Sequence, residues 1–282
     1  MENANSILEP VLAWESLRSG QLYPEIRCAL DDRFVEAYLH ATGETHPLYA
    51  HYVPPLSLTY VRFAKTALGG RWPNGTLQIS QGLRCHRPLR RGEDVAIGLR
   101  IGLAEVRDGR SYLELVSTIR DANGKIACEQ TMTNLWVSPS AAPPAPRAAR
   151  GGQPTAPSIS PSSGAGHLGP RTDRFPAERI RAYAAIAGAH DPVHLDADYA
   201  RTTPVGVNIA QGQLVMTLIS QLMVDQFNLR WLERGTLDLR LRRPVRVDEL
   251  VTAHAVPSGD GTFSVWCENA CGERVIAGTA SV

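Results

Sequence analysis

The sequence predicts an α+β protein built from two similar units, and three observations support that prediction. The first is an internal repeat, since VEAYLHATGETHPLYA at 35–50 resembles IRAYAAIAGAHDPVHL at 180–195. The second is an Arg-Pro pair after each copy, at 87–88 and 243–244, which opens a run of strand-like segments. The third is one apolar helical stretch ahead of each run. Two copies of one supersecondary plan indicate duplication.

Each unit is predicted to end in an antiparallel meander of three strands. The segments are 95–106, 112–120 and 125–137 in the first unit, and 250–257, 262–268 and 274–282 in the second. Glycine and asparagine separate neighbouring segments, as in Asp108-Gly109 and Asn123-Gly124. These residues adopt the positive φ that tight hairpins require, so the runs pair as hairpins.

One helix is predicted ahead of each meander, over 55–68 in the first unit and 212–227 in the second. Apolar residues recur at helical spacing from Leu214 to Leu222, and the first helix stops at Gly69-Gly70. A helix that is mostly apolar must be covered on several sides. We therefore expect each sheet to curve strongly around its helix.

Between the two units lies a stretch that does not read as part of either one. Residues 138–172 are rich in proline, alanine, serine and glycine and almost free of large apolar side chains. Such a segment buries too little surface to order itself, so it is predicted to be a linker. The predicted organisation is an N-terminal unit over 1–137, a linker over 138–172 and a C-terminal unit over 173–282.

The overall charge and the cysteines exclude several classes of protein. The chain has 29 Lys and Arg against 28 Asp and Glu, a net charge of +1, which offers no basic surface for nucleic acid or for acidic membranes. The 5 cysteines include no C-x-x-C pair and read as reduced thiols. Neither an export signal nor a membrane-length apolar run is present in the sequence. A cytoplasmic protein is predicted.

The motif in the second copy resembles a known signature. AAIAGAHDPVHLD at 184–196, followed by Ala210-Gln211-Gly212, is similar to A-x-x-[ST]-G-D-x-N-P-[LI]-H-x-D and then A-H-G of the MaoC-like hydratase and dehydratase family. ATGETHPLY at 41–49 looks like the N-terminal unit of its two-unit members. The resemblance implies a double hotdog, in which two curved antiparallel sheets each wrap around a central helix.

The resemblance also implies a reaction and a set of site residues. The substrate would be an acyl thioester of coenzyme A or of acyl carrier protein, hydrated as a 2-enoyl chain or dehydrated as a 3-hydroxyacyl chain, with no further cofactor. His194 would be the principal acid/base and Asp191 a second catalytic group. The Gly212 amide would stabilise the oxyanion, and Gln211 and His190 would contact substrate.

One position departs from the family in a way that matters for the chemistry. Ala189 stands where the family has its aspartate, and Gln211 replaces the histidine of A-H-G. Three interpretations remain open. Asp191 takes over the carboxylate role; or His194 acts largely alone, in dehydration or in double-bond isomerisation; or the protein only binds the thioester, as a partner subunit. Thioesterase activity is another known use of the fold, but no separate motif indicates it.

The remaining candidates have simpler interpretations. Asp191 precedes a proline and could cap a helix, and Gly212 could serve close packing. In the first copy Glu44 holds the aspartate position, but Tyr49, with a pKa of about 10, is a poor base in place of histidine, so one site per chain is expected.

The sequence also bears on metal binding and on assembly. His190 and His194 are spaced for one helix face, but Pro192 interrupts a regular helix there, so no metal site is predicted. Exposed edges of hotdog sheets usually pair, and the two units of one chain can cover each other. A homodimer is therefore compatible with the sequence but not required.

Overall fold

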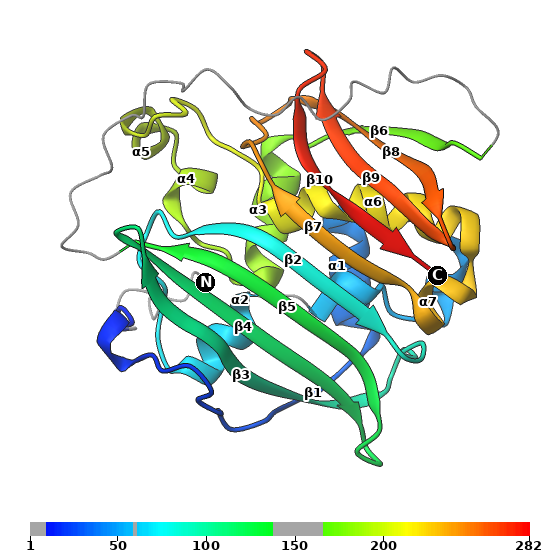
Figure 1. The fold of residues 1–282 in the computed structure, drawn as a ribbon, viewed down its shortest axis with the longest axis horizontal. Coiled ribbons are helices and arrows are strands. Elements are labelled where there is room, and N and C mark those ends of the chain that lie inside the picture. Colours follow the sequence, from blue (N-terminus) through cyan, green and yellow to red (C-terminus); the bar gives the residue numbers. More distant parts are fainter. Residues whose placement is uncertain (1–9, 59–60, 138–165) are drawn as a thin grey trace.

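The computed structural model describes residues 10–58, 61–137 and 166–282, and their strands form one 10-stranded antiparallel sheet (Figure 1). The strands are β1 (Ile26–Ala29), β2 (Leu77–Cys85), β3 (Asp94–Arg107), β4 (Arg110–Asp121), β5 (Ile126–Trp136), β6 (Leu168–Arg174), β7 (Thr236–Leu241), β8 (Leu250–Gly259), β9 (Thr262–Asn269) and β10 (Arg274–Ser281). Their order across the sheet is β1-β3-β4-β5-β2-β7-β10-β9-β8-β6. The predicted α+β class is confirmed, since helices pack against an antiparallel sheet to which both units contribute strands.

The helices lie behind this sheet in the view of Figure 1, except for two short ones that lie beside it at the upper left. They are α1 (Asp32–Thr42), α2 (Val61–Leu68), α3 (Ala177–Ala187), α4 (Pro192–Leu195), α5 (Ala197–Thr202), α6 (Gly212–Phe227) and α7 (Leu229–Arg234), with short 3-10 helices η2 (Trp14–Ser16), η3 (Pro47–Ala50) and η4 (Pro55–Leu58). None of the helices in the described ranges has the length and apolarity needed to cross a membrane.

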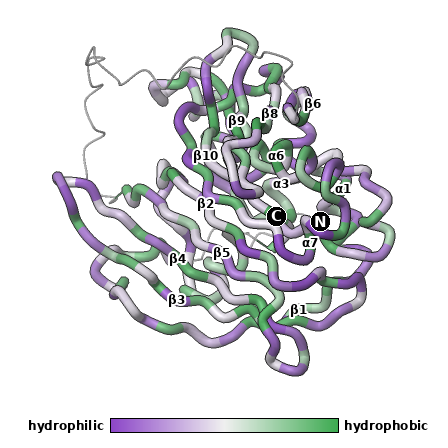
Figure 2. The backbone as a smooth tube through the Cα atoms, turned by 45° about the vertical axis from the view of Figure 1, so that its right-hand side comes forward, coloured by the Kyte–Doolittle hydropathy of each residue, from purple (hydrophilic) through white to green (hydrophobic). Residues whose placement is uncertain are grey.

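The two predicted meanders are present, and a further pair of strands joins them. β3-β4-β5 and β10-β9-β8 are neighbours in the sheet, as expected. β2 pairs with β7, from Ser80 opposite Arg240 to Arg84 opposite Thr236. Each unit thereby covers an edge of the other, and the two sheets become continuous. Hydrophilic and apolar residues alternate along many strands in Figure 2, as expected when one face is buried.

Two predicted boundaries need correction. The linker was predicted to extend to 172, but β6 takes up 168–172, because its backbone pairs with β8 from Leu168 opposite Ala255 to Arg174 opposite Leu250. The rest of the predicted linker, 138–165, lies outside the described residues. The helix predicted over 55–68 begins as η4 and ends as α2, and 59–60 between them also lie outside the described residues.

The central helix α6 supplies much of the core and has the predicted bounds. Every residue from Gln213 to Val224 is buried, and α6 packs against β6, β8 and β9. Trp231 of α7 is fully buried and its Nε1 donates to Ser220 Oγ at 3.1 Å. The apolar cover expected for this helix is therefore provided on several sides, by sheet and by helix.

Helices α1 and α3, one from each unit, pack against each other through an arginine. Arg179 of α3 donates from Nε to Ala41 O at 3.3 Å and from Nη2 to Thr42 O, the carbonyls that end α1. Gly43 has φ 69° and lies under the guanidinium, where a Cβ would meet Nη2 at 3.1 Å. A positive φ and this close approach both favour glycine.

Candidate active site

The repeated motif of the C-terminal unit forms a helix end, a turn and a helix start. Gly188 ends α3 with φ 67°, and Ala189 N donates to Ala184 O at 3.2 Å across that end. Pro192 is the first residue of α4, where the N–H that proline lacks would have had no intrahelical partner. Asp191 is the N-cap, so its predicted capping role is confirmed.

His194 is held by one backbone carbonyl, and this fixes which nitrogen is free to act. Its Nδ1 lies 2.9 Å from Ile209 O. A carbonyl only accepts hydrogen bonds, so Nδ1 carries the hydrogen and Nε2 of the neutral ring has the lone pair. Burial lowers the pKa of His194 below its ordinary 6.5, while the bond to Ile209 and the charge of Asp191 act in the opposite direction. The ring is thus a neutral base at neutral pH.

Both carboxylate oxygens of Asp191 accept backbone N–H groups. Oδ1 accepts from Val193 N at 3.0 Å and Oδ2 accepts from Gly75 N at 2.6 Å. The first bond caps α4, and the second ties the turn to the N-terminal unit. The Asp191 carboxylate therefore fixes the position of the helix that carries His194.

The loop that holds His194 leads directly into α6. Ile209 supplies the carbonyl, and Gly212, three positions later in the sequence, is the first residue of α6. An N–H at this first helical position has no partner within the helix. A Cβ on Gly212 would lie 2.1 Å from Leu241 Cδ2, so glycine also permits the close approach of β7 that was one of its predicted roles.

Gln211 and His190 occupy different surroundings from each other. Gln211 is 4% exposed, and its Nε2 donates to Ile180 O at 3.1 Å, which ties the start of α6 to α3. Its Oε1 is buried without a hydrogen-bond partner among the described residues. His190 is exposed and precedes α4, so it does not share a helix with His194. In the described ranges no three His, Cys, Asp or Glu side chains are grouped to hold a metal.

Two contacts from the N-terminal unit were not foreseen from the sequence. Lys65 of α2 donates from Nζ to Gly188 O at 2.6 Å, one residue before Ala189. Gly75, in the loop before β2, donates to Asp191 as described above. Neither residue belongs to a recognisable motif, and each lies more than 100 positions from its partner. The site is consequently assembled from both units.

The equivalent turn of the N-terminal unit has different chemistry. Glu44 is 3% exposed and burial raises its pKa from 4.5 to about 7. The phenols of Tyr49 and Tyr38 act against that rise, although no described group meets hydrogen-bond geometry with either Glu44 oxygen. Burial also raises the pKa of Tyr49 well above its ordinary value. Pro55 occupies the position that corresponds to Gly212 and has no N–H to offer.

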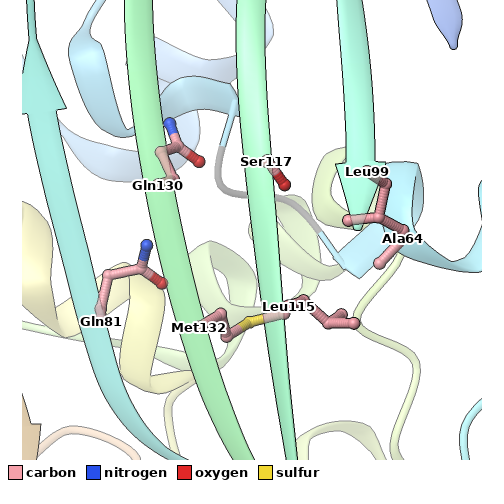
Figure 3. Close-up of a pocket in the computed structure, with 7 residues that line it drawn as sticks. All are labelled: Ala64, Gln81, Leu99, Leu115, Ser117, Gln130 and Met132. Carbon is pink, nitrogen blue, oxygen red and sulfur yellow. The ribbon is translucent and has the colours of Figure 1, made fainter. Parts of the chain in front are cut away.

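A small cavity of ≈ 20 Å³, large enough for about one water molecule, lies between α2 and the inner face of the N-terminal sheet (Figure 3). Its lining residues are Ala64, Gln81, Leu99, Leu115, Ser117, Gln130 and Met132. One lining residue, Met132, contacts the start of α6: Gln213 Nε2 donates to Met132 Sδ at 3.4 Å. Gln213 directly follows Gly212 in α6.

Known proteins share the fold of this chain and the sequence pattern of its C-terminal unit. Residues 160–274 match the family model of the MaoC like domain. A solved MaoC-like dehydratase superposes with a TM-score of 0.75 at 17% identity, covering 96% of this chain and 99% of the other. HtdX of Mycobacterium tuberculosis superposes with a TM-score of 0.67 at 20% identity. The match covers 92% of this chain and 100% of HtdX.

A conserved protein of Mycobacterium tuberculosis with a double hotdog fold gives a TM-score of 0.58 at 15% identity, covering 96% of this chain and 98% of that protein. Identities this low establish a shared fold and nothing finer. No curated protein matches the chain.

Proposed function

We propose, from the premise that this chain is a MaoC-like hotdog protein, that it interconverts 3-hydroxyacyl and 2-enoyl thioesters with His194 as the acid/base. The observation that supports this most is the orientation of the imidazole. Nδ1–H is committed to Ile209 O, which leaves Nε2 as a base whose pKa is lowered by burial. A neutral ring at working pH is what removal of a proton from carbon requires.

In the dehydration direction, the proposed step uses one histidine twice. Nε2 of His194 takes the proton from C2 of the acyl chain while negative charge develops on the thioester oxygen. The Gly212 N–H, at the positive end of α6, stabilises that oxygen. The imidazolium then gives its proton to the C3 hydroxyl, which leaves as water as the C2–C3 double bond forms. Hydration is the same sequence in reverse.

Asp191 is proposed as a positioning residue in this scheme. Both of its oxygens accept backbone N–H groups, and these bonds fix the turn that carries His194. Ala189 supplies no carboxylate, which leaves the single-base scheme as the simplest one. We propose further that the acyl group arrives on coenzyme A or on an acyl carrier protein, that no other cofactor takes part, and that Gln211 and His190 contribute by framing the substrate entrance.

The proposal is tested by following 2-enoyl thioester absorbance with purified full-length protein and 2-enoyl-CoA or 3-hydroxyacyl-CoA. We expect interconversion by the wild type and a loss of about 100-fold or more in His194→Ala, the scale of a missing acid/base. His40→Ala, an exposed histidine on α1 with no assigned role, is the matched control and should retain activity.

Three other results would each contradict the proposal. Equal turnover by His194→Ala and the wild type would remove His194 from the mechanism. Binding of both thioesters without interconversion in either direction would leave a thioester-binding partner. Release of free coenzyme A would instead indicate thioesterase activity.

A further inference from the structure

The loop that leads into α6 is joined to α4 by a side chain as well as by backbone. α4 is a single turn of four residues, and its Val193 carbonyl accepts from two donors of the loop. Asn208 Nδ2 donates to Val193 O at 3.0 Å, and Ile209 N donates to the same oxygen at 3.4 Å. The shorter of the two bonds is therefore the one that the Asn208 side chain makes.

Asn208 is itself held in place through its backbone. Its carbonyl accepts from Val247 N at 3.0 Å, which anchors the loop to the segment that leads into β8. On the α4 side, Asp191 Oδ1 accepts from Val193 N at 3.0 Å. The backbone of Val193 is thus held at its N–H by Asp191 and at its carbonyl by Asn208.

This bond sets where the Ile209 carbonyl lies relative to His194. His194 follows Val193 in the sequence, Ile209 follows Asn208, and His194 Nδ1 lies 2.9 Å from Ile209 O. The imidazole and its carbonyl partner are therefore the next residues along the two segments that the Asn208 side chain joins. A carbonyl oxygen only accepts, so an amide N–H suits this contact and an aliphatic side chain of similar size would leave it unmade.

We propose that Asn208 is a positioning residue that holds Ile209 O against His194 Nδ1, and so keeps the hydrogen on Nδ1 and the lone pair on Nε2. The hydrogen bond that one nitrogen of a neutral imidazole makes decides which nitrogen carries the hydrogen. When the carbonyl moves away, the hydrogen can occupy Nε2, which then cannot accept a proton from carbon. The catalytic part of this inference rests on the proposed function, because it takes His194 to be the base.

The test is a long-range proton–nitrogen correlation spectrum of the histidine rings of the full chain at pH 8, where the His194 ring is neutral because its pKa lies below 6.5. The nitrogen shifts separate a ring nitrogen that carries a hydrogen from one that does not. The His194 signals are those that His194→Ala lacks. We expect the hydrogen on Nδ1 in the wild type, and a population with the hydrogen on Nε2 in Asn208→Leu.

Turnover of a 3-hydroxyacyl-CoA gives a second readout from the same variants. The tautomer affects proton transfer and not the contacts that bind substrate, so Asn208→Leu should lower kcat by about 10-fold or more and change KM little.

A matched control makes the same chemical change elsewhere. Asn123 is exposed in the hairpin between β4 and β5, so Asn123→Leu should match the wild type in both readouts. Thermal unfolding of each variant separates a changed tautomer from a lost fold. If Asn208→Leu unfolds, Asn208→Ala, which only shortens the side chain, still tests the inference.

The outcomes distinguish this inference from the function on which it rests. An unchanged tautomer in Asn208→Leu, whether kcat falls or not, overturns the inference, and the hydro-lyase activity stands if the wild type turns over and His194→Ala does not. A changed tautomer in Asn208→Leu without thioester turnover by the wild type overturns the activity and supports the positioning role. Neither turnover nor a change of tautomer overturns both.

Discussion

At the scale of single residues, His194 owes its proposed role to two features that act together. The Ile209 carbonyl selects the tautomer, and burial disfavours the charged ring. Asp191 opposes that second effect, because its negative charge raises the pKa of His194. The motif alone indicated the histidine and the cap, whereas the balance between burial and charge depends on chain segments distant in the sequence.

This balance predicts the pH dependence of activity. Because His194 must be neutral to accept a proton, kcat/KM should fall only below pH 6.5, the ordinary pKa of histidine. Asp191→Asn removes the charge that raises this pKa, so the acidic limb of the profile should move to lower pH. Asp198→Asn changes an exposed carboxylate and is the control. An acidic limb that moves upward in Asp191→Asn would contradict this assignment.

Glu44 gives a prediction about stability. Its pKa is raised in the folded protein, so the folded state prefers the protonated acid, and the free energy of unfolding should fall as pH rises from 4.5 through about 7. Glu44→Gln removes this penalty and should stabilise the protein by up to roughly 3 kcal/mol at pH 8, with little effect below pH 4.5.

Urea unfolding of Glu44→Gln and the wild type at both pH values measures the difference. Glu178→Gln, an exposed change on α3, provides the baseline. A stabilisation of equal size at both pH values would show that Glu44 is not protonated in the folded protein.

At the scale of elements, the segments that were predicted well are those defined by local signals. The meanders β3-β4-β5 and β8-β9-β10 have turn residues at each hairpin, and α6 has its apolar periodicity. β2 and β7 were missed. β2 has Ser80-Gln81-Gly82 at its centre, so it lacks an apolar pattern and is defined by pairing with β5 and β7.

β6 and the contacts of the site illustrate the same limit. The sequence of β6, LGPRTDR, is polar enough to read as linker, and only its ladder with β8 makes it a strand. Lys65 and Gly75 contact the turn of the other unit, which no pattern within the motif could reveal. Local chemistry therefore predicted His194 and its turn, while long-range packing decided how that turn is held.

The packing of α1 on α3 depends on one side chain and gives an element-level prediction. Arg179 bonds the carbonyls that end α1, so Arg179→Ala removes a donor from Ala41 O and leaves Thr42 O with the weak bond from Gln221 Nε2 at 3.5 Å. We expect a loss of about 1–3 kcal/mol in the free energy of unfolding, seen as a lower melting temperature. Arg181→Ala, an exposed arginine on the same helix, should have almost no effect. Equal melting temperatures for both variants would contradict the capping role.

At the scale of the whole molecule, the two units share a sheet, a helix pair and the site. β2 pairs with β7, Arg179 joins α3 to α1, and Gly75 bonds Asp191. With so much shared structure, neither unit is expected to be stable while the other is unfolded. Calorimetry of the full chain should give one transition, with equal calorimetric and van't Hoff enthalpies. Two separate transitions would show that the units are independent.

The arrangement also explains why one chain carries one proposed site. The N-terminal turn has Tyr49 and Pro55 where the C-terminal turn has His194 and Gly212, so it lacks both the base and the amide donor. The N-terminal unit instead contributes Lys65 and Gly75, which contact the turn of the C-terminal unit. Duplication has thus given two units that differ in chemistry within one continuous sheet.

The most direct test of the central claim is deuterium exchange at C2 of a 3-hydroxyacyl thioester incubated with the protein in D2O. If Nε2 of His194 moves the C2 proton, the wild type and the control variant His40→Ala will incorporate deuterium at C2, and His194→Ala will not. Incorporation by His194→Ala at the wild-type rate would contradict the account.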